Sequence, residues 1–136
     1  MSLDDTAFHT WLAAYGAAWE SFDAGAYLPL FSGDAVYHWT PFEAPCRGHD
    51  EIRAALERAM ERQSDLTFRF EIIAVKGETG WAKWEASFTR QGTEYPVRVD
   101  GVLAARFDTA GKCVEFREWW HALEPGQADE MQAVDA

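Results

Sequence analysis

The spacing of the hydrophobic residues differs between the two halves of this chain, and that difference constrains the fold more than any other feature of the sequence. At residues 8–22 and 52–60, apolar residues recur at steps of three and four, which is typical of helices with one buried face. From Leu66 onward they alternate with polar residues, which is typical of strands with one buried face. Helical segments followed by a run of strands indicate an α+β fold.

Two full helices and a short helical turn are expected in the first half of the chain. The first helix begins near Asp5, and large side chains form its apolar stripe: Phe8, Trp11, Leu12, Tyr15, Trp19 and Phe22. A short turn follows at residues 27–31, where Pro29 limits the regularity. A strand is expected at residues 35–40. The second helix begins at Gly48, and its apolar stripe is narrow: Ile52, Ala55, Leu56, Ala59 and Met60.

The second half of the chain reads as strands at residues 66–73, 81–89, 95–107 and 113–122. Turn signals at Gln91-Gly92 and at residues 108–111 separate them, and these short connections predict an antiparallel meander. The predicted order of elements is therefore α-α-β-α-β-β-β-β. Residues 124–136 are acidic and carry little apolar material, so we expect one domain over residues 1–123 and a flexible tail.

Charge and composition exclude several classes of partner. The formal net charge of −11 opposes binding to a phosphate backbone, so nucleic acid is not an expected partner. No segment approaches the roughly 18 uninterrupted apolar residues that span a bilayer, so no membrane is expected either. The chain begins with neither a basic nor an apolar leader, which predicts a cytoplasmic location. Cys46 and Cys113 are expected to be free thiols.

Aromatic residues make up 15% of the chain and include seven Trp and nine Phe, so aromatic rings must form much of the core or the wall of a cavity.

Three stretches, at residues 30–36, 47–52 and 101–121, resemble SnoaL-like proteins of the nuclear-transport-factor-like superfamily. The order of elements extends the resemblance from Phe8 to Leu123. It implies a cone-like curved antiparallel sheet wrapped around the helices, with a small-molecule pocket at the open end and a homodimer formed through the outer sheet face. Because the fold carries many activities and also non-catalytic association modules, the function must be argued from the site.

Two chemistries of this superfamily do not fit the sequence. Ketosteroid isomerases use an Asp base, a second, protonated Asp and a helix Tyr. Tyr15 falls at the place of that Tyr, but the positions of the two acids hold Trp39 and Leu103. Limonene-type epoxide hydrolases carry an Arg-x-Asp motif on the middle meander strand, whereas Arg98-Val99-Asp100 lies on the next strand along. The middle strand is expected to turn apolar residues inward instead: Ala82, Trp84, Ala86 and Phe88.

The last strand supplies the best candidate for an acid or base. Arg117-Glu118-Trp119 resembles the Arg-Asp-aromatic stretch whose acid points into the hydrolase pocket. Alternation along a strand places Glu118 on the cavity side, together with Phe116 and Trp120.

The resulting cavity is apolar, with one carboxyl near its centre. Desolvation there would raise the pKa of Glu118, which would suit it to general acid or base catalysis near neutral pH. Tyr15 is its expected catalytic partner. Six further residues are expected to contact the substrate: Tyr37, Trp39, Trp84, Leu103, Phe116 and Trp120. No cofactor is expected, nor a metal, since the His residues share no metal-ligand spacing.

Simpler interpretations stay open at this point. Glu118 can be tied to Tyr15 or Tyr37, or form a salt bridge at the mouth of the cone, and the aromatic rings can merely pack. Three functions therefore compete. The first is a cofactor-free isomerase, cyclase, dehydratase or hydrolase that acts on a small apolar polyketide- or terpenoid-like molecule. The others are a ligand carrier and a non-catalytic association module. The sequence does not decide whether the protein is an enzyme.

Overall fold

The computed structural model of the protein describes residues 3–124. The first part of the chain forms helices α1 (Asp5–Glu20) and α2 (Ala24–Tyr27), a 3₁₀ turn (Leu28–Leu30), strands β1 (Phe31–His38) and β2 (Cys46–Arg47), and helix α3 (Gly48–Met60). Four long strands follow: β3 (Gln63–Lys76), β4 (Thr79–Arg90), β5 (Pro96–Phe107) and β6 (Cys113–Leu123). The tail at residues 124–136, which the sequence predicts to be flexible, lies outside the described residues except for Glu124.

The predicted α+β architecture is confirmed, with all strands in one sheet of order β2-β1-β6-β5-β4-β3. β3 to β6 form the predicted antiparallel meander. The sheet is antiparallel except at one pair, where β1 runs parallel to β6. A parallel pair needs a long connection between its strands, and α3 and the first three meander strands supply it. The two-residue strand β2 was missed, since two residues show no period.

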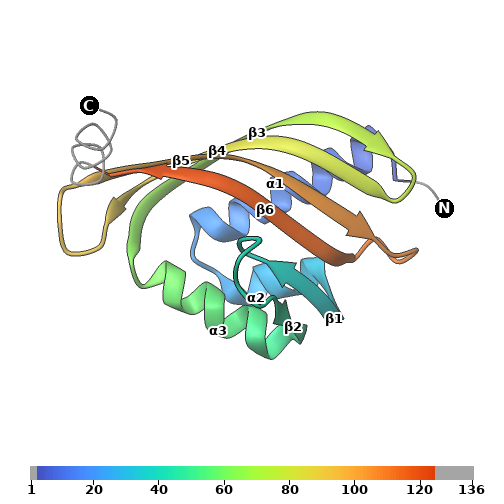
Figure 1. Ribbon diagram of the computed structural model, residues 1–136, viewed down its shortest axis with the longest axis horizontal. Coiled ribbons are helices and arrows are strands. Elements are labelled where there is room, and N and C mark those ends of the chain that lie inside the picture. The colour runs from blue at the N-terminus through green and yellow to red at the C-terminus, as the bar shows by residue number, and fades with distance from the viewer. Residues whose placement is uncertain (1–2, 125–136) are drawn as a thin grey trace.

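The sheet is strongly curved but does not close (Figure 1), and the four long strands arch over α2 and α3. The β3–β4 register shifts between Ser64 and Thr67 and again between Ile72 and Ala74. An irregular position of this kind bends a strand and increases its twist. The curvature creates the concave face on which the helices pack.

The core lies between this concave face and the helices. α1 begins at Asp5, as predicted, where the Asp4 carboxylate accepts a hydrogen bond of 2.7 Å from the Ala7 amide and caps the helix. The apolar stripe of α1 is buried from Phe8 to Tyr15, with Phe8 and Leu12 fully covered. Along β4 the predicted inward residues are all buried: Ala82, Trp84, Ala86 and Phe88. None of the helices in residues 3–124 is both long enough and apolar enough to cross a membrane.

β5 and β6 approach each other closely at Gly101. A Cβ atom at this position would lie 2.4 Å from the carbonyl oxygen of Trp119 and 2.9 Å from Cβ of Trp120. The backbone must therefore move to admit a methyl group, and we expect Gly101→Ala to lower the free energy of unfolding by about 1–3 kcal/mol. Gly33 is the matched control on β1, because a Cβ atom added there would meet nothing within 4 Å. Urea unfolding of the two variants should therefore show a loss only for Gly101→Ala.

Candidate functional site

Glu118 is the one charged side chain that is buried in residues 3–124, with 5% of its surface exposed. It lies on β6 and faces the helices, as strand alternation predicted. Two tyrosine hydroxyls donate to the same carboxyl oxygen, Oε1: Tyr37 at 2.7 Å and Tyr15 at 3.1 Å. Among the described residues, no group donates to Oε2. The carboxyl is thus held through one oxygen, and the other is left for a proton or a ligand.

Tyr27 extends this hydrogen-bond network beyond the two tyrosines that the sequence pointed to. Its hydroxyl donates to the hydroxyl of Tyr37 at 3.1 Å, and the hydroxyls of Tyr15 and Tyr37 lie 3.3 Å apart. Burial raises the pKa of all three tyrosines, so they stay protonated and act as donors. No pattern in the sequence indicated a role for Tyr27, because its hydroxyl meets that of Tyr37 only in the folded chain.

Burial raises the pKa of Glu118 to about 7, and the hydrogen bonds from Tyr37 and Tyr15 oppose this rise without cancelling it. The desolvation of the carboxylate is therefore the dominant effect. A carboxyl group with this pKa is present in both protonation states near neutral pH, which is what a general acid or base requires.

Glu118 opens into a cavity of about 360 Å³ between the concave sheet face and the helices. Of the residues predicted for the site, Tyr15, Tyr37, Trp39, Trp84 and Trp120 line this cavity. Apolar residues from α1, α3, β4, β5 and β6 complete much of its wall: Trp19, Leu56, Ala59, Phe88, Val97, Val99 and Ala122.

Leu103 and Phe116 are corrections to the predicted cavity wall. Both are fully buried, and neither belongs to the cavity lining. Leu103 pairs with Glu118 across β5 and β6, and Phe116 stacks on Tyr37 with the ring centroids 4.8 Å apart. Strand alternation predicted their face of the sheet but not their depth. They support the tyrosines and the carboxyl from within the core.

The mouth of the cavity is polar, unlike its interior. Arg62, Gln63, Arg90 and Glu124 line it, and Arg90 forms an ion pair with Glu124. These positions were not predicted, because the ends of α3, β4 and β6 meet there only through the curvature of the sheet.

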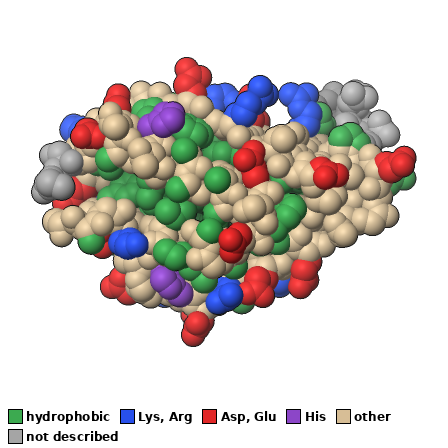
Figure 2. Space-filling model, turned by 180° about the vertical axis from the view of Figure 1, so that it is seen from behind, with side chains coloured by type: hydrophobic (Ala, Val, Ile, Leu, Met, Phe, Trp, Pro, Cys, Tyr) green, Lys and Arg blue, Asp and Glu red, His purple; other side chains and the backbone are tan. Residues whose placement is uncertain are grey.

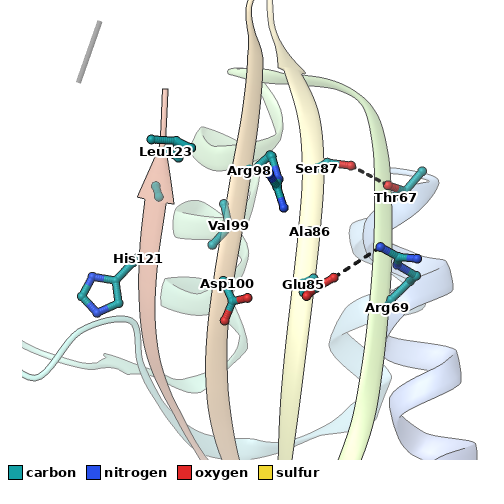
Figure 3. Close-up of a pocket in the computed structure, with 11 residues that line it drawn as sticks. Thr67, Arg69, Glu85, Ala86, Ser87, Arg98, Val99, Asp100, His121 and Leu123 are labelled. Atoms are coloured by element: carbon teal, nitrogen blue, oxygen red, sulfur yellow. Dashed lines mark hydrogen bonds and ion pairs between the residues drawn. The ribbon is translucent and has the colours of Figure 1, made fainter. Parts of the chain in front are cut away.

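The outer face of the sheet carries a second hollow, of about 460 Å³. Figure 3 shows Arg98 and Asp100 on this face of β5, with Ser87 and Glu85 on the adjacent strand β4. The Arg-x-Asp motif therefore points away from Glu118. His121 lies on the same face, beside Asp100 in the strand register.

Figure 2 shows one face of the molecule, on which acidic side chains lie at the edge and toward the middle, Lys and Arg side chains gather along the upper edge, and hydrophobic side chains are visible across the middle. Within residues 3–124, no group of three or more His, Cys, Asp or Glu side chains is arranged to hold a metal ion. Cys46 and Cys113 are both free thiols, as predicted.

The hydrogen bond from Tyr37 stabilises the ionised form of Glu118, and its removal provides a test of the network. We expect Tyr37→Phe to raise the pH midpoint of the Glu118 titration by about one to two pH units, since a hydrogen bond to a charged group contributes about 1.5–3 kcal/mol. Tyr27→Phe is the matched control, because Tyr27 donates to Tyr37 and not to the carboxyl. Carboxyl ¹³C shifts measured against pH give both midpoints, and an unchanged midpoint in Tyr37→Phe would contradict the assignment.

Residues 12–116 match the family model of the SnoaL-like domain, and the chain therefore belongs to the SnoaL-like family. No curated protein matches the sequence.

Solved structures share the fold at low sequence identity. The crystal structure of RV0760c from Mycobacterium tuberculosis is 14% identical with a TM-score of 0.77, and the match covers 90% of this chain and 98% of that one. SalBIII, described as an epoxide hydrolase/cyclase-like enzyme in pyran ring formation in the polyether salinomycin, is 16% identical with a TM-score of 0.75 over 87% of this chain and 93% of its own. A computationally designed 17-OHP binder is 16% identical with a TM-score of 0.72 over 85% of this chain and 96% of its own.

Proposed function

We propose that this protein binds a small, mostly apolar molecule in the Glu118 cavity and catalyses a cofactor-free proton transfer on it, with Glu118 as the general acid or base. One observation carries the proposal: a buried carboxyl whose pKa is raised to about 7 lies in the wall of an aromatic cavity. Tyr15 and Tyr37 hold the carboxyl by Oε1, which leaves Oε2 to exchange a proton with the ligand.

The cavity restricts the ligand and the reaction. Its aromatic interior suits a polyketide- or terpenoid-like skeleton, and its polar mouth suits a substituent that stays in water. One carboxyl that both takes up and releases a proton suits an isomerisation, cyclisation, dehydration or hydrolysis. The fold shared with SalBIII, described as epoxide hydrolase/cyclase-like, supports this range of reactions. The cytoplasmic location stays a prediction.

A carrier without turnover is the second candidate function. It is favoured by the fact that, within residues 3–124, Glu118 is the one acid in the interior of the cavity, while Glu124 lies at the mouth in an ion pair. A carrier would use the carboxyl only to anchor its ligand.

Ligand binding is tested by the melting temperature in the presence of apolar ketones, lactones and epoxides. A compound that binds the folded state raises the melting temperature by mass action. Ala59→Phe places a ring in the cavity wall and should abolish the rise, whereas Ala54→Phe, at an exposed position on the same helix, should not. Compounds that raise the melting temperature are then assayed for turnover, which separates an enzyme from a carrier. A panel without any effect on the wild type would contradict both functions.

The residues on the outer face of the sheet favour a homodimer, in which the protein partner is a second copy of this chain. Val102 and Trp119 lie directly opposite each other on β5 and β6, and they are 36% and 45% exposed. Residues of both charge signs lie on the same face, among them Arg98 and Asp100. Such a face can complement itself across a twofold axis. Light scattering should give twice the chain mass for the wild type and a single chain mass for Trp119→Arg.

A further inference from the structure

Four tryptophans line the cavity, and they form two pairs that differ in what their indole N–H groups contact. Trp19 donates to the side-chain oxygen of Gln63, and Trp120 donates to the backbone carbonyl of Trp39, each at 2.9 Å. The indole nitrogens of Trp39 and Trp84 are buried and have no hydrogen-bond partner in residues 3–124. A buried donor without an acceptor costs free energy unless a ligand or a water molecule supplies the acceptor.

The two residues that carry the unpartnered donors line the cavity from different parts of the sheet, Trp39 directly after β1 and Trp84 on β4. Trp39 directly follows His38, which pairs with Arg117, so Trp39 lies beside Glu118. Trp84 lies on β4, where it is 3% exposed and pairs with Gly101. The wall of the Glu118 cavity therefore carries one of these tryptophans on the β1 side and the other on the β4 side.

The tyrosines leave no other donor in the interior of the cavity when Glu118 is ionised. Each hydroxyl has one proton. Tyr27 gives its proton to Tyr37, while Tyr37 and Tyr15 give theirs to Oε1 of Glu118. The arginines lie at the mouth. The two indole N–H groups are thus the donors that stay available to a ligand deep in the cavity.

We propose that the ligand carries an oxygen that accepts hydrogen bonds, of the ketone, lactone or ester kind, and that Trp39 and Trp84 bind this oxygen through their indole N–H groups. The inference rests on the proposed function and narrows its ligand class. An indole nitrogen donates but does not accept, so it needs an acceptor atom such as an oxygen, and a protonated amine, which only donates, cannot satisfy it. A hydrocarbon would leave both donors unpartnered. The two tryptophans therefore select for oxygenated molecules and place the oxygen next to Oε2 of Glu118.

The test uses two probes with the same ring skeleton, trans-2-decalone and trans-decalin, which differ by one carbonyl group. Each is titrated into ¹⁵N-labelled wild-type protein at about pH 8.5, where the carboxyl of Glu118 is mainly ionised and does not donate. The spectrum contains seven indole N–H signals, one for each Trp. Decalone should move the signals of Trp39 and Trp84 downfield, and decalin should not. The signals of Trp19 and Trp120 should respond equally to both probes.

Substitution by Phe removes the N–H group and retains an aromatic ring. Trp39→Phe and Trp84→Phe should each weaken decalone binding about fivefold relative to decalin binding, which corresponds to one hydrogen bond. Trp19→Phe and Trp120→Phe are the matched controls, because their N–H groups already have partners in the protein. These controls should change the affinity for both probes by the same factor.

The possible outcomes separate this inference from the function on which it rests. If both probes bind equally well and the ratio of their affinities stays constant in Trp39→Phe and Trp84→Phe, the inference is wrong while the cavity remains a ligand site. If neither probe binds and no ketone, lactone or epoxide raises the melting temperature, the proposed function itself fails. Even if a substituted protein does not fold, the wild-type spectra show whether the decalone oxygen contacts the indole N–H groups of Trp39 and Trp84.

Discussion

Glu118→Gln is expected to lower the turnover number for a substrate of this protein by about 10²–10⁴-fold, the usual contribution of a general acid or base. Gln retains an oxygen that Tyr15 and Tyr37 can bond, and it has nearly the shape of Glu, so the cavity stays intact. It cannot take up or release a proton at Oε2. The dissociation constant of the substrate should therefore change much less than the turnover number.

Glu115→Gln is the control for this experiment, since Glu115 lies on the same strand but is not part of the cavity lining. It should keep wild-type turnover. Single-turnover and binding measurements on both variants separate the chemical step from ligand affinity. Unchanged turnover in Glu118→Gln would contradict the assignment of Glu118 as the acid or base. The carrier function would then account better for the cavity.

The second large effect is on stability, and it needs no substrate. Glu118 has a pKa of about 7 in the folded protein against 4.5 as its ordinary value. Below pH 4.5 the carboxyl is protonated in both the folded and the unfolded chain. As the pH rises from 4.5 to 7, the unfolded chain releases the proton while the folded chain keeps it, so stability is lost. Above pH 7 both states are ionised and the loss stays constant at about 3 kcal/mol.

Comparison of the wild type with Glu118→Gln isolates the contribution of Glu118. The free energy of unfolding of the wild type minus that of the variant should fall by about 3 kcal/mol between pH 4.5 and 7 and then level off. Glu94→Gln, at an exposed loop position, should show no such change. Urea unfolding across this pH range gives the values. A flat difference curve would mean that Glu118 is well solvated in the folded protein.

Local patterns predicted the elements well where a regular period ran through many residues. The stripe on α1 from Phe8 to Tyr15 and the alternation on β4 were both confirmed, because burial of one face imposes the period of the helix or strand on the sequence. Phe22, the last residue of the predicted stripe, lies beyond the end of α1 at Glu20. The boundaries were less accurate. β1 begins at Phe31 rather than Ala35, since Ser32, Gly33 and Asp34 do not have the composition of a strand. Their strand geometry depends on the pairing partners that β1 finds in β2 and β6.

The candidate site was predicted in part, and the misses have a common cause. Glu118, Tyr15 and Tyr37 come together as expected. Tyr27 was missed, and Leu103 and Phe116 were placed in the cavity wall although they lie beneath it. The two-residue alternation along a strand specifies the face of the sheet on which a side chain lies. How deeply that side chain is buried depends on how far the sheet bends at that point.

By itself, the sequence determined the α+β class, the face of each long strand and the inward direction of a single acid among aromatic residues. These follow from local periodicity, which each segment carries in its own residues. The tertiary structure alone decided that β1 runs parallel to β6, that two tyrosines donate to the same oxygen of Glu118, and that two of the four cavity tryptophans keep unpartnered N–H groups. Those features depend on contacts between residues up to about a hundred positions apart, and only the curvature of the sheet and the packing of the helices bring such residues together.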